Sequence, residues 1–193
     1  MAISVGVRKP GTPMMWGFGP TPDGETLLQQ PFQPGFAEVS SNVPLLIGTT
    51  FNELQRLRYD ENVTILTADA VGGKRNAETY MYMFTWRSPV TRGSVHGNEL
   101  NFCFNTLNLS KRELPVISEK DKKFADLMSD VWAKFAHSGN PIICGLPEWP
   151  SYTSNNGATM ILDYECVLKN NYDRKLTDII NKHCFRQLDE FNN

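Results

Sequence analysis

The 193-residue sequence predicts an α/β fold, in which helices connect and cover the strands of a sheet. Short apolar runs at 43–48, 80–86 and 158–162 have the length and composition of strands. The segments between these runs are long enough to hold helices, which favours an α/β class over an all-β class. One of those segments, 119–138, repeats its apolar residues with the 3.6-residue period of a helix.

Residues 1–42 carry few regular signals and are punctuated by glycine and proline. A stretch of this length without strands or helices is uncommon at the start of a compact domain. We therefore expect an extended connecting segment over 1–42 and a strand and helix portion over 43–193.

Each expected strand has its own signature. The run Val43–Gly48 is continuously apolar, which is typical of a strand that is buried on both faces. Residues 80–86 are rich in aromatic side chains and predict a second central strand. Residues 158–162 predict a third and shorter strand.

Two helices are expected in the second half of the chain. The helix over 119–138 has an apolar face made of Phe124, Leu127, Met128, Val131, Trp132, Phe135 and Ala136. Ser118 and Asp121 resemble a capping box before it, and Gly139 suits its C-terminal end. A second helix over 173–191 has a stripe of Leu176, Ile179, Ile180, Cys184 and Leu188. Packing against the protein core explains the apolar residues on one side of each helix, so neither helix needs a functional explanation.

Composition excludes several classes of function. The formal net charge of −2 gives no basic field for nucleic acid. No apolar run approaches the ~18 residues of a membrane span, and residues 1–10 lack the apolar core of a signal peptide.

The four cysteines, Cys103, Cys144, Cys166 and Cys184, have no metal-ligand spacing, so no metal site is expected. Free, mostly buried thiols are favoured, with two disulfides as the alternative.

The three histidines limit the candidates for a general base. His137 ends the helix over 119–138, where its charge would complement the helix dipole. His183 lies in the last expected helix and is interpreted as a structural residue. His96 lies in a glycine-flanked loop after the strand at 80–86, which is a typical place for a catalytic group.

Glu53 has the equivalent position after the strand at 43–48. An acid followed by a histidine in chain order forms two thirds of a Ser-acid-His triad. The sequence contains no G-x-S-x-G nucleophile elbow. Ser94, in the segment Gly93–Gly97, is out of register with that pattern and only two residues from His96. It also lacks the following helix that would help to form an oxyanion hole.

Five segments, in order along the chain, match a known pattern. They are Pro22–Gly24 with Leu27–Pro31, Val43–Glu53, Tyr80–Phe84, His96–Leu100 with Phe102 and Phe104, and Trp132–Pro141 with Trp149–Tyr152. Together they resemble the C-terminal portion of the type-B carboxylesterases, the cholinesterase-like branch of the α/β hydrolases. The resemblance covers nearly the whole sequence, 1–193.

The resemblance implies a partial α/β-hydrolase fold, made of the later strands of the central sheet with their flanking helices. It implies hydrolysis of a small-molecule carboxylic ester through an acyl-serine, without a metal or an organic cofactor. Glu53 would be the acid of the triad and His96 its base. Members of the family are often secreted, but the sequence itself leaves the compartment open.

Two departures from the family stand out. The half that would carry the nucleophilic serine is absent from the sequence, and only 43 residues separate Glu53 from His96, where the family has a longer helical insertion. The chain is therefore interpreted as one part of a split or truncated esterase, or as a degenerate, non-catalytic binding or adhesion protein. A sheet cut in this way has an unpaired edge beside 43–48, which a complementary N-terminal half or a homodimer would cover.

Overall fold

The computed structural model describes residues 22–28, 38–53, 65, 68–69, 72–109, 111 and 114–180. The chain divides into two units, Met1–Ser40 and Ser41–Asn193. In the first unit, the Asp23 carboxylate accepts hydrogen bonds from three following backbone N–H groups, and a short 3-10 helix, η1, covers Glu38–Ser40. Most of the expected connecting segment, 1–42, lies outside the described residues.

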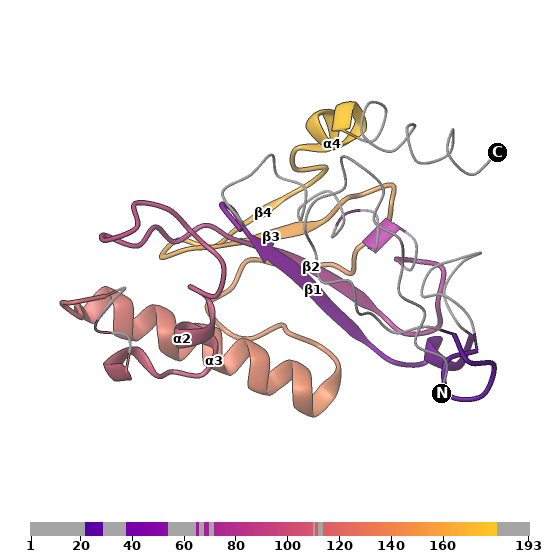
Figure 1. The fold of residues 1–193 in the computed structure, drawn as a ribbon, viewed down its shortest axis with the longest axis horizontal. Helices are drawn as coiled ribbons and strands as arrows, with labels where there is room; N and C mark the ends of the chain where they lie inside the picture. Colours follow the sequence, from indigo (N-terminus) through magenta and orange to yellow (C-terminus); the bar gives the residue numbers. More distant parts are fainter. Residues whose placement is uncertain are drawn as a thin grey trace. The chain divides into compact units, whose positions relative to one another are not determined.

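The second unit is built on a four-stranded sheet with the order β1-β2-β3-β4 (Figure 1). Its strands are β1 (Leu45–Thr50), β2 (Thr79–Phe84), β3 (Thr159–Leu162) and β4 (Val167–Lys169). The first three are parallel, and β4 runs antiparallel to β3. The α/β class is confirmed, and the three expected strands are present. The sequence did not predict β4, because three residues with exposed ends give no apolar run.

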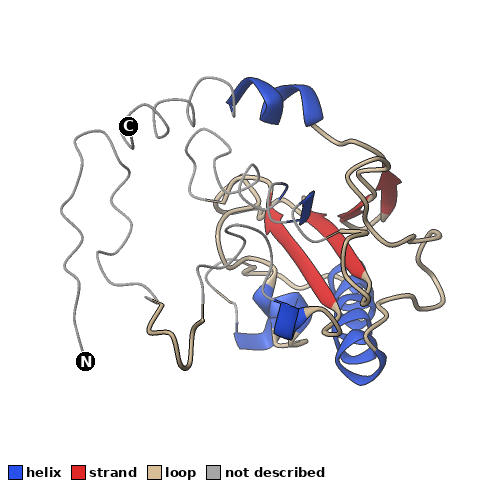
Figure 2. Cartoon of the chain, turned by 90° about the vertical axis from the view of Figure 1, so that its right-hand side faces the viewer, coloured by secondary structure: helices blue, strands red, loops and turns tan. Residues whose placement is uncertain are grey.

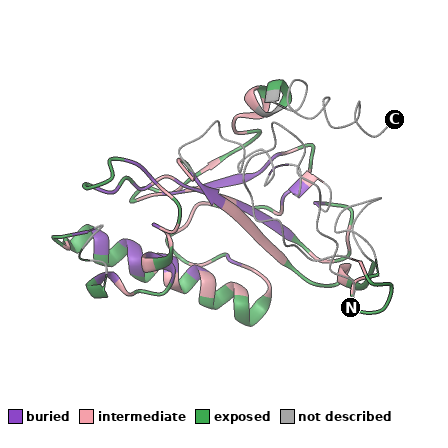
Figure 3. Ribbon diagram, in the orientation of Figure 1, coloured by how far each residue is buried: buried purple, intermediate pink, exposed green. Residues whose placement is uncertain are grey.

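Strand β2 is the centre of the sheet, and five of its six residues are buried (Figure 3). Its side chains alternate between the two faces, as the strand period requires. Tyr80 and Phe84 belong to the large core beneath helix α3, whereas Met81 packs with Tyr152 in a smaller core.

The expectation that 43–48 is buried on both faces is wrong. Leu45–Gly48 of β1 are only half-buried, because β1 pairs with β2 alone and forms an edge of the sheet among the described residues. Leu46 packs against the large core and Ile47 against the small one, and the ring of Tyr82 lies against Gly48 and leaves no room for a Cβ atom.

Helix α3 covers Glu119–Ser138, the range that the sequence predicts. The Ser118 side chain and the Asp121 carboxylate form the expected capping box, and Gly139 ends the helix with a φ of 71°. Most of the predicted apolar face is buried or half-buried, but Ala136 is exposed, and Ala125 is buried instead.

The remaining helices lie on both sides of the sheet. The short helix α2 (Leu100–Cys103) lies beside α3 on one side, and α4 (Arg174–Ile180) lies on the other (Figures 1 and 2). The rings of Phe84, Phe102 and Phe124 contact one another and join β2, α2 and α3.

Arg174 attaches α4 through an ion pair with Asp69 and a hydrogen bond to the Tyr152 hydroxyl. The helix expected over 173–191 is present over the α4 residues, and the rest of it, with His183, lies outside the described residues. The sequence did not predict α2 or the 3-10 helix η2 (Leu107–Leu109), each of which is about one turn long.

The described cysteines are free thiols, as favoured, but the expectation that they are mostly buried is only partly met. Cys103 is buried, Cys166 is half-buried and Cys144 is exposed, whereas Cys184 lies outside the described residues.

Within the part of the chain that the structure describes, no helix has the length and apolar character needed to cross a bilayer.

The capping box gives a prediction about stability. Replacing Ser118 with alanine removes the acceptor for the Asp121 N–H, so the free energy of unfolding should fall by about 1 kcal/mol. Urea denaturation measures this change. The control is Ser129→Ala within the same helix, which should change the free energy of unfolding by only a few tenths of a kcal/mol. Equal losses in the two variants would contradict the role of the cap.

Candidate active site

The candidate site lies where the chain leaves β1 and meets the loop that follows β2. Beyond the end of β1, the chain pairs in parallel with the loop that follows β2, through an isolated bridge between Asn52 and Val95. The Asn52 N–H donates to the Ser94 carbonyl oxygen at 2.8 Å, and the His96 N–H donates to the Glu53 carbonyl oxygen at 3.0 Å. This backbone ladder places the two sequence-predicted site residues side by side.

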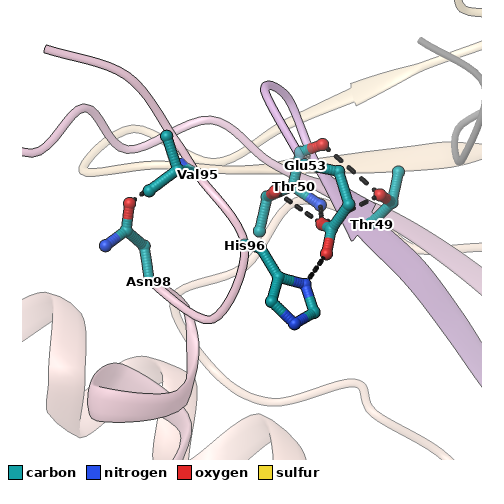
Figure 4. A network of polar contacts seen from close by, with 6 residues as sticks. All are labelled: Thr49, Thr50, Glu53, Val95, His96 and Asn98. Atoms are coloured by element: carbon teal, nitrogen blue, oxygen red, sulfur yellow. Dashed lines mark hydrogen bonds and ion pairs between the residues drawn. The ribbon is translucent and has the colours of Figure 1, made fainter. Parts of the chain in front are cut away.

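The side chains of Glu53 and His96 form a hydrogen bond between Oε1 and Nδ1 (Figure 4). Because a carboxylate accepts, Nδ1 carries the proton in this arrangement, and Nε2 is the ring nitrogen that can act as a base. The Glu53 side chain is 18% exposed and that of His96 is 72% exposed. The acid is thus held inside the protein while its histidine is turned outward.

The second oxygen of Glu53 is fixed by β1 itself. Oε2 accepts hydrogen bonds from the Thr50 hydroxyl at 2.6 Å, the Thr50 N–H at 3.0 Å and the Thr49 hydroxyl at 3.2 Å. Burial by itself raises the pKa of Glu53, but the hydrogen bonds from Thr50 and His96 outweigh it and lower the pKa below its usual value. Glu53 is therefore an ionised and oriented carboxylate at neutral pH.

Ser94 has a structural position. Its side chain is completely buried, and its hydroxyl donates to the carbonyl oxygen of Phe84 at the end of β2 at 2.7 Å. Its N–H donates to Oδ1 of Asn52 at 3.1 Å. These contacts hold the loop against the two strand ends, so the position of Ser94 agrees with the sequence argument against a nucleophile.

The turn that presents His96 is closed by its own residues. The Asn98 side chain is buried and accepts the Val95 N–H at 2.8 Å, while the Asn98 N–H donates to the Val95 carbonyl oxygen (Figure 4). Gly97 between them has a φ of 80°, a conformation that favours glycine. These bonds fix the conformation of the turn from which the His96 side chain extends.

Sequence reasoning missed three titratable side chains near this turn, those of Glu99, Cys103 and Tyr82. Burial raises the pKa of the Glu99 carboxyl group, and it raises the pKa of the Cys103 thiol to about 12. The Tyr82 phenol on β2 also has a raised pKa, because of its burial and of the nearby acidic groups. Glu99 belongs to the quoted His96–Leu100 segment, but the sequence gives no sign that its carboxyl group is buried.

The pair formed by Glu53 and His96 can perform acid–base chemistry at Nε2 of His96.

His137 is exposed at the last turn of α3, where the sequence placed it as a helix-end residue. The described ranges of the chain contain no cluster of three or more His, Cys, Asp or Glu residues that could hold a metal ion.

The comparison with protein families identifies one match. The model of the carboxylesterase family matches residues 60–180. The para-nitrobenzyl esterase of Bacillus subtilis (strain 168) is 24% identical over 200 residues, which cover 79% of this chain and 41% of that esterase. Carboxylesterase 1C of Rattus norvegicus is 36% identical over 92 residues, which cover 44% of this chain and 16% of that protein. The chain therefore spans less than half the length of these relatives.

Solved esterase structures share the fold. An esterase from Clostridium hathewayi, described as able to hydrolyse aliphatic aromatic polyesters, has a TM-score of 0.65 and 22% identity over 84% of this chain and 42% of that one. The carboxylesterase EST55 of Geobacillus stearothermophilus has a TM-score of 0.63 and 23% identity over 82% of this chain and 43% of that one. The α/β-hydrolase fold predicted for the described part of the chain is thereby confirmed.

The bonds around Glu53 predict a change in its titration. In Thr50→Val the shortest hydrogen bond to Oε2 is lost, so the pKa of Glu53 should rise towards its usual value of 4.5. Carbon-13 NMR of the glutamate carboxyl groups as a function of pH measures this change. The control is Thr85→Val, because the Thr85 hydroxyl donates to Asp163 instead. An unchanged Glu53 titration in Thr50→Val would show that Thr50 does not set its charge.

Proposed function

The chain belongs to the carboxylesterase family, and we propose that it provides the acid, Glu53, and the base, His96, of an ester-hydrolysing triad. The serine of that triad lies outside this sequence, because no G-x-S-x-G segment occurs in it. The observation that carries the proposal is the hydrogen bond from His96 Nδ1 to an ionised, half-buried Glu53.

In the proposed reaction, Nε2 of His96 removes the proton of the serine hydroxyl as its oxygen attacks the ester carbonyl carbon. The same imidazolium then donates the proton to the departing alcohol, which leaves an acyl-serine. Water, activated by Nε2, hydrolyses the acyl-serine and releases the carboxylic acid. Glu53 stabilises the imidazolium in both steps and keeps the proton of the neutral ring on Nδ1.

Carboxylic esters are the proposed substrate class. The relatives are named para-nitrobenzyl esterase and carboxylesterase, which supports this class. The proposed source of the serine is a complementary N-terminal half, since the chain spans 41% of the length of the Bacillus relative. That half would lie against the edge strand β1, which is adjacent to Glu53.

The alternative is a non-catalytic binding protein of the same family. The missing G-x-S-x-G segment favours it. The hydrogen bond between Glu53 and His96 favours the esterase, because a binding surface does not require a base supported by an oriented acid.

Complementation tests the esterase. Co-expression with an N-terminal half of an esterase that carries G-x-S-x-G should give hydrolysis of para-nitrophenyl esters. In the active complex, His96→Ala should lower kcat/KM by about 10⁵- to 10⁶-fold, because it removes the base. Glu53→Gln should lower it by about 10³- to 10⁴-fold, because it keeps the shape and removes the charge.

The matched control for the complementation is His137→Ala, which should leave kcat/KM unchanged because His137 lies at the end of α3. An active complex in which His96→Ala keeps the full kcat/KM would disprove the assignment. If no N-terminal half gives activity while the chain binds a partner tightly, the binding protein replaces the esterase.

The chain alone should not react with a serine-directed fluorophosphonate, because the Ser94 hydroxyl is buried and bonded to Phe84. Mass spectrometry after labelling checks this result. Ser94→Ala should instead lower the free energy of unfolding by about 1 kcal/mol, because the carbonyl oxygen of Phe84 loses the Ser94 hydroxyl as a donor and keeps the Phe51 N–H. A covalent label that disappears in Ser94→Ala would make Ser94 a nucleophile.

A further inference from the structure

Asn52, the residue before Glu53, contacts the loop of His96 through both its main chain and its side chain. Its N–H donates to the Ser94 carbonyl oxygen at 2.8 Å, and its Oδ1 atom accepts the Ser94 N–H at 3.1 Å. Ser94 is completely buried, so its N–H needs an acceptor from the protein. In a regular parallel ladder a backbone carbonyl provides such an acceptor, whereas here the Asn52 side chain provides it.

The close approach of Asn52 to the loop depends on Gly93. A Cβ atom at position 93 would lie 3.0 Å from Oδ1 of Asn52, which is tighter than an ordinary contact. Gly93 ends the excursion over 85–93, which separates the last residue of β2, Phe84, from Ser94. Because the chain leaves β2 over this excursion, the bonds that Ser94 and its neighbours form determine where His96 lies.

Three consecutive N–H groups, those of 94–96, donate to identified acceptors. The Ser94 N–H donates to Oδ1 of Asn52, and the His96 N–H donates to the Glu53 carbonyl oxygen. The N–H between them donates to Oδ1 of Asn98, which belongs to the turn itself. Asn52 is thus a side chain that connects the loop of the base to the segment that carries the acid.

We propose that Asn52 is a positioning residue of the Glu53–His96 pair: its carboxamide oxygen holds Ser94 in the place from which Nδ1 of His96 reaches Oε1 of Glu53. This inference rests on the proposed function, in which Nε2 of the same ring is the base. Without Oδ1, the buried N–H of Ser94 lacks an acceptor, and the loop shifts to find one. A displacement of about 1 Å is enough to lower the rate of a reaction about 10²-fold.

The first test measures the tautomer of His96 in the chain alone, by nitrogen-15 NMR of the imidazole at a pH where the ring is neutral. In the wild type the proton should lie on Nδ1, because Glu53 accepts it there. Asn52→Ala should lower the fraction of the Nδ1-protonated form, because the ring moves away from Glu53. Asn52→Asp keeps an oxygen atom in the position of Oδ1 and should keep the wild-type fraction.

The matched control is Asn156→Ala. Oδ1 of Asn156 also accepts backbone N–H groups, those of Thr153 and Ala158, but in a turn before the start of β3. This variant should lower the free energy of unfolding, as Asn52→Ala does, and should leave the tautomer of His96 unchanged.

Two results of the tautomer measurement would overturn the proposal. A loss of stability in Asn52→Ala with an unchanged tautomer would give Asn52 a structural role only. An equal loss of the Nδ1-protonated form in Asn52→Asp and Asn52→Ala would show that the acceptor oxygen is not the cause.

Gly93→Ala tests the same contact in a chain that keeps Asn52. Its φ lies outside the left-handed region, so alanine can adopt the backbone conformation. The added methyl group crowds Oδ1 of Asn52, so the fraction of the Nδ1-protonated form should fall. This variant decides the matter if Asn52→Ala does not fold, and an unchanged tautomer in it would contradict the proposal.

The last test uses the active complex with an N-terminal half. Asn52→Ala should lower kcat by about 10- to 100-fold with KM nearly unchanged, because it disturbs the orientation of the base and not the binding of the ester. Asn156→Ala should leave both constants unchanged. An active complex in which Asn52→Ala keeps the full kcat would overturn the proposal. If no complex is active, the tautomer of the chain alone still decides the role of Asn52, so failure of this proposal is distinct from failure of the esterase.

Discussion

The parallel register of β1 against β2 is the constraint on which the site depends. Parallel strands end at the same edge of a sheet, and here the loop after β2 returns to the end of β1 and pairs with it through the bridge between Asn52 and Val95. A slip of one residue would move Glu53 by about 3.3 Å and turn its side chain to the other face of the sheet. The ring of Tyr82 against Gly48 opposes such a slip, because no other residue of β1 lacks a Cβ atom. The hydrogen bond between the acid and the histidine is thus a consequence of backbone pairing.

The parts of the fold that could be predicted are those whose signals are local and long. The helix α3 spans five turns, and its apolar repeat and capping box fix both of its ends. Strands β2 and β3 lie within apolar runs that match central strands. The four-residue helix α2 and the three-residue strand β4 hold too few residues to show a period, so only their tertiary contacts reveal them. The burial of β1 was overestimated because an apolar run does not show how many neighbours a strand has.

The candidate site was predictable to the level of residue positions. Glu53 and His96 each follow a strand in the right chain order, and a parallel sheet brings such positions together. The hydrogen bond from the Thr50 hydroxyl to Glu53 is a local contact between residues three apart, whereas the position of Ser94 depends on its contacts with Phe84 and Asn52. The apolar and strand patterns of the sequence indicate neither contact. Burial of the Glu99 carboxyl group depends in the same way on the packing of α2 against the strands.

The two carboxyl groups of the site have opposite environments. Oε2 of Glu53 accepts three hydrogen bonds, whereas Oε2 of Glu99 is buried with no donor among the described residues. The pKa of Glu53 is accordingly lowered and that of Glu99 is raised, although they lie near the same imidazole. A buried carboxyl oxygen without a donor lowers stability, and an apolar side chain at that position would avoid the cost. Paired acids whose pKa values are driven apart are a recurring feature of acid–base sites. This asymmetry is therefore consistent with the acid–base role proposed for His96.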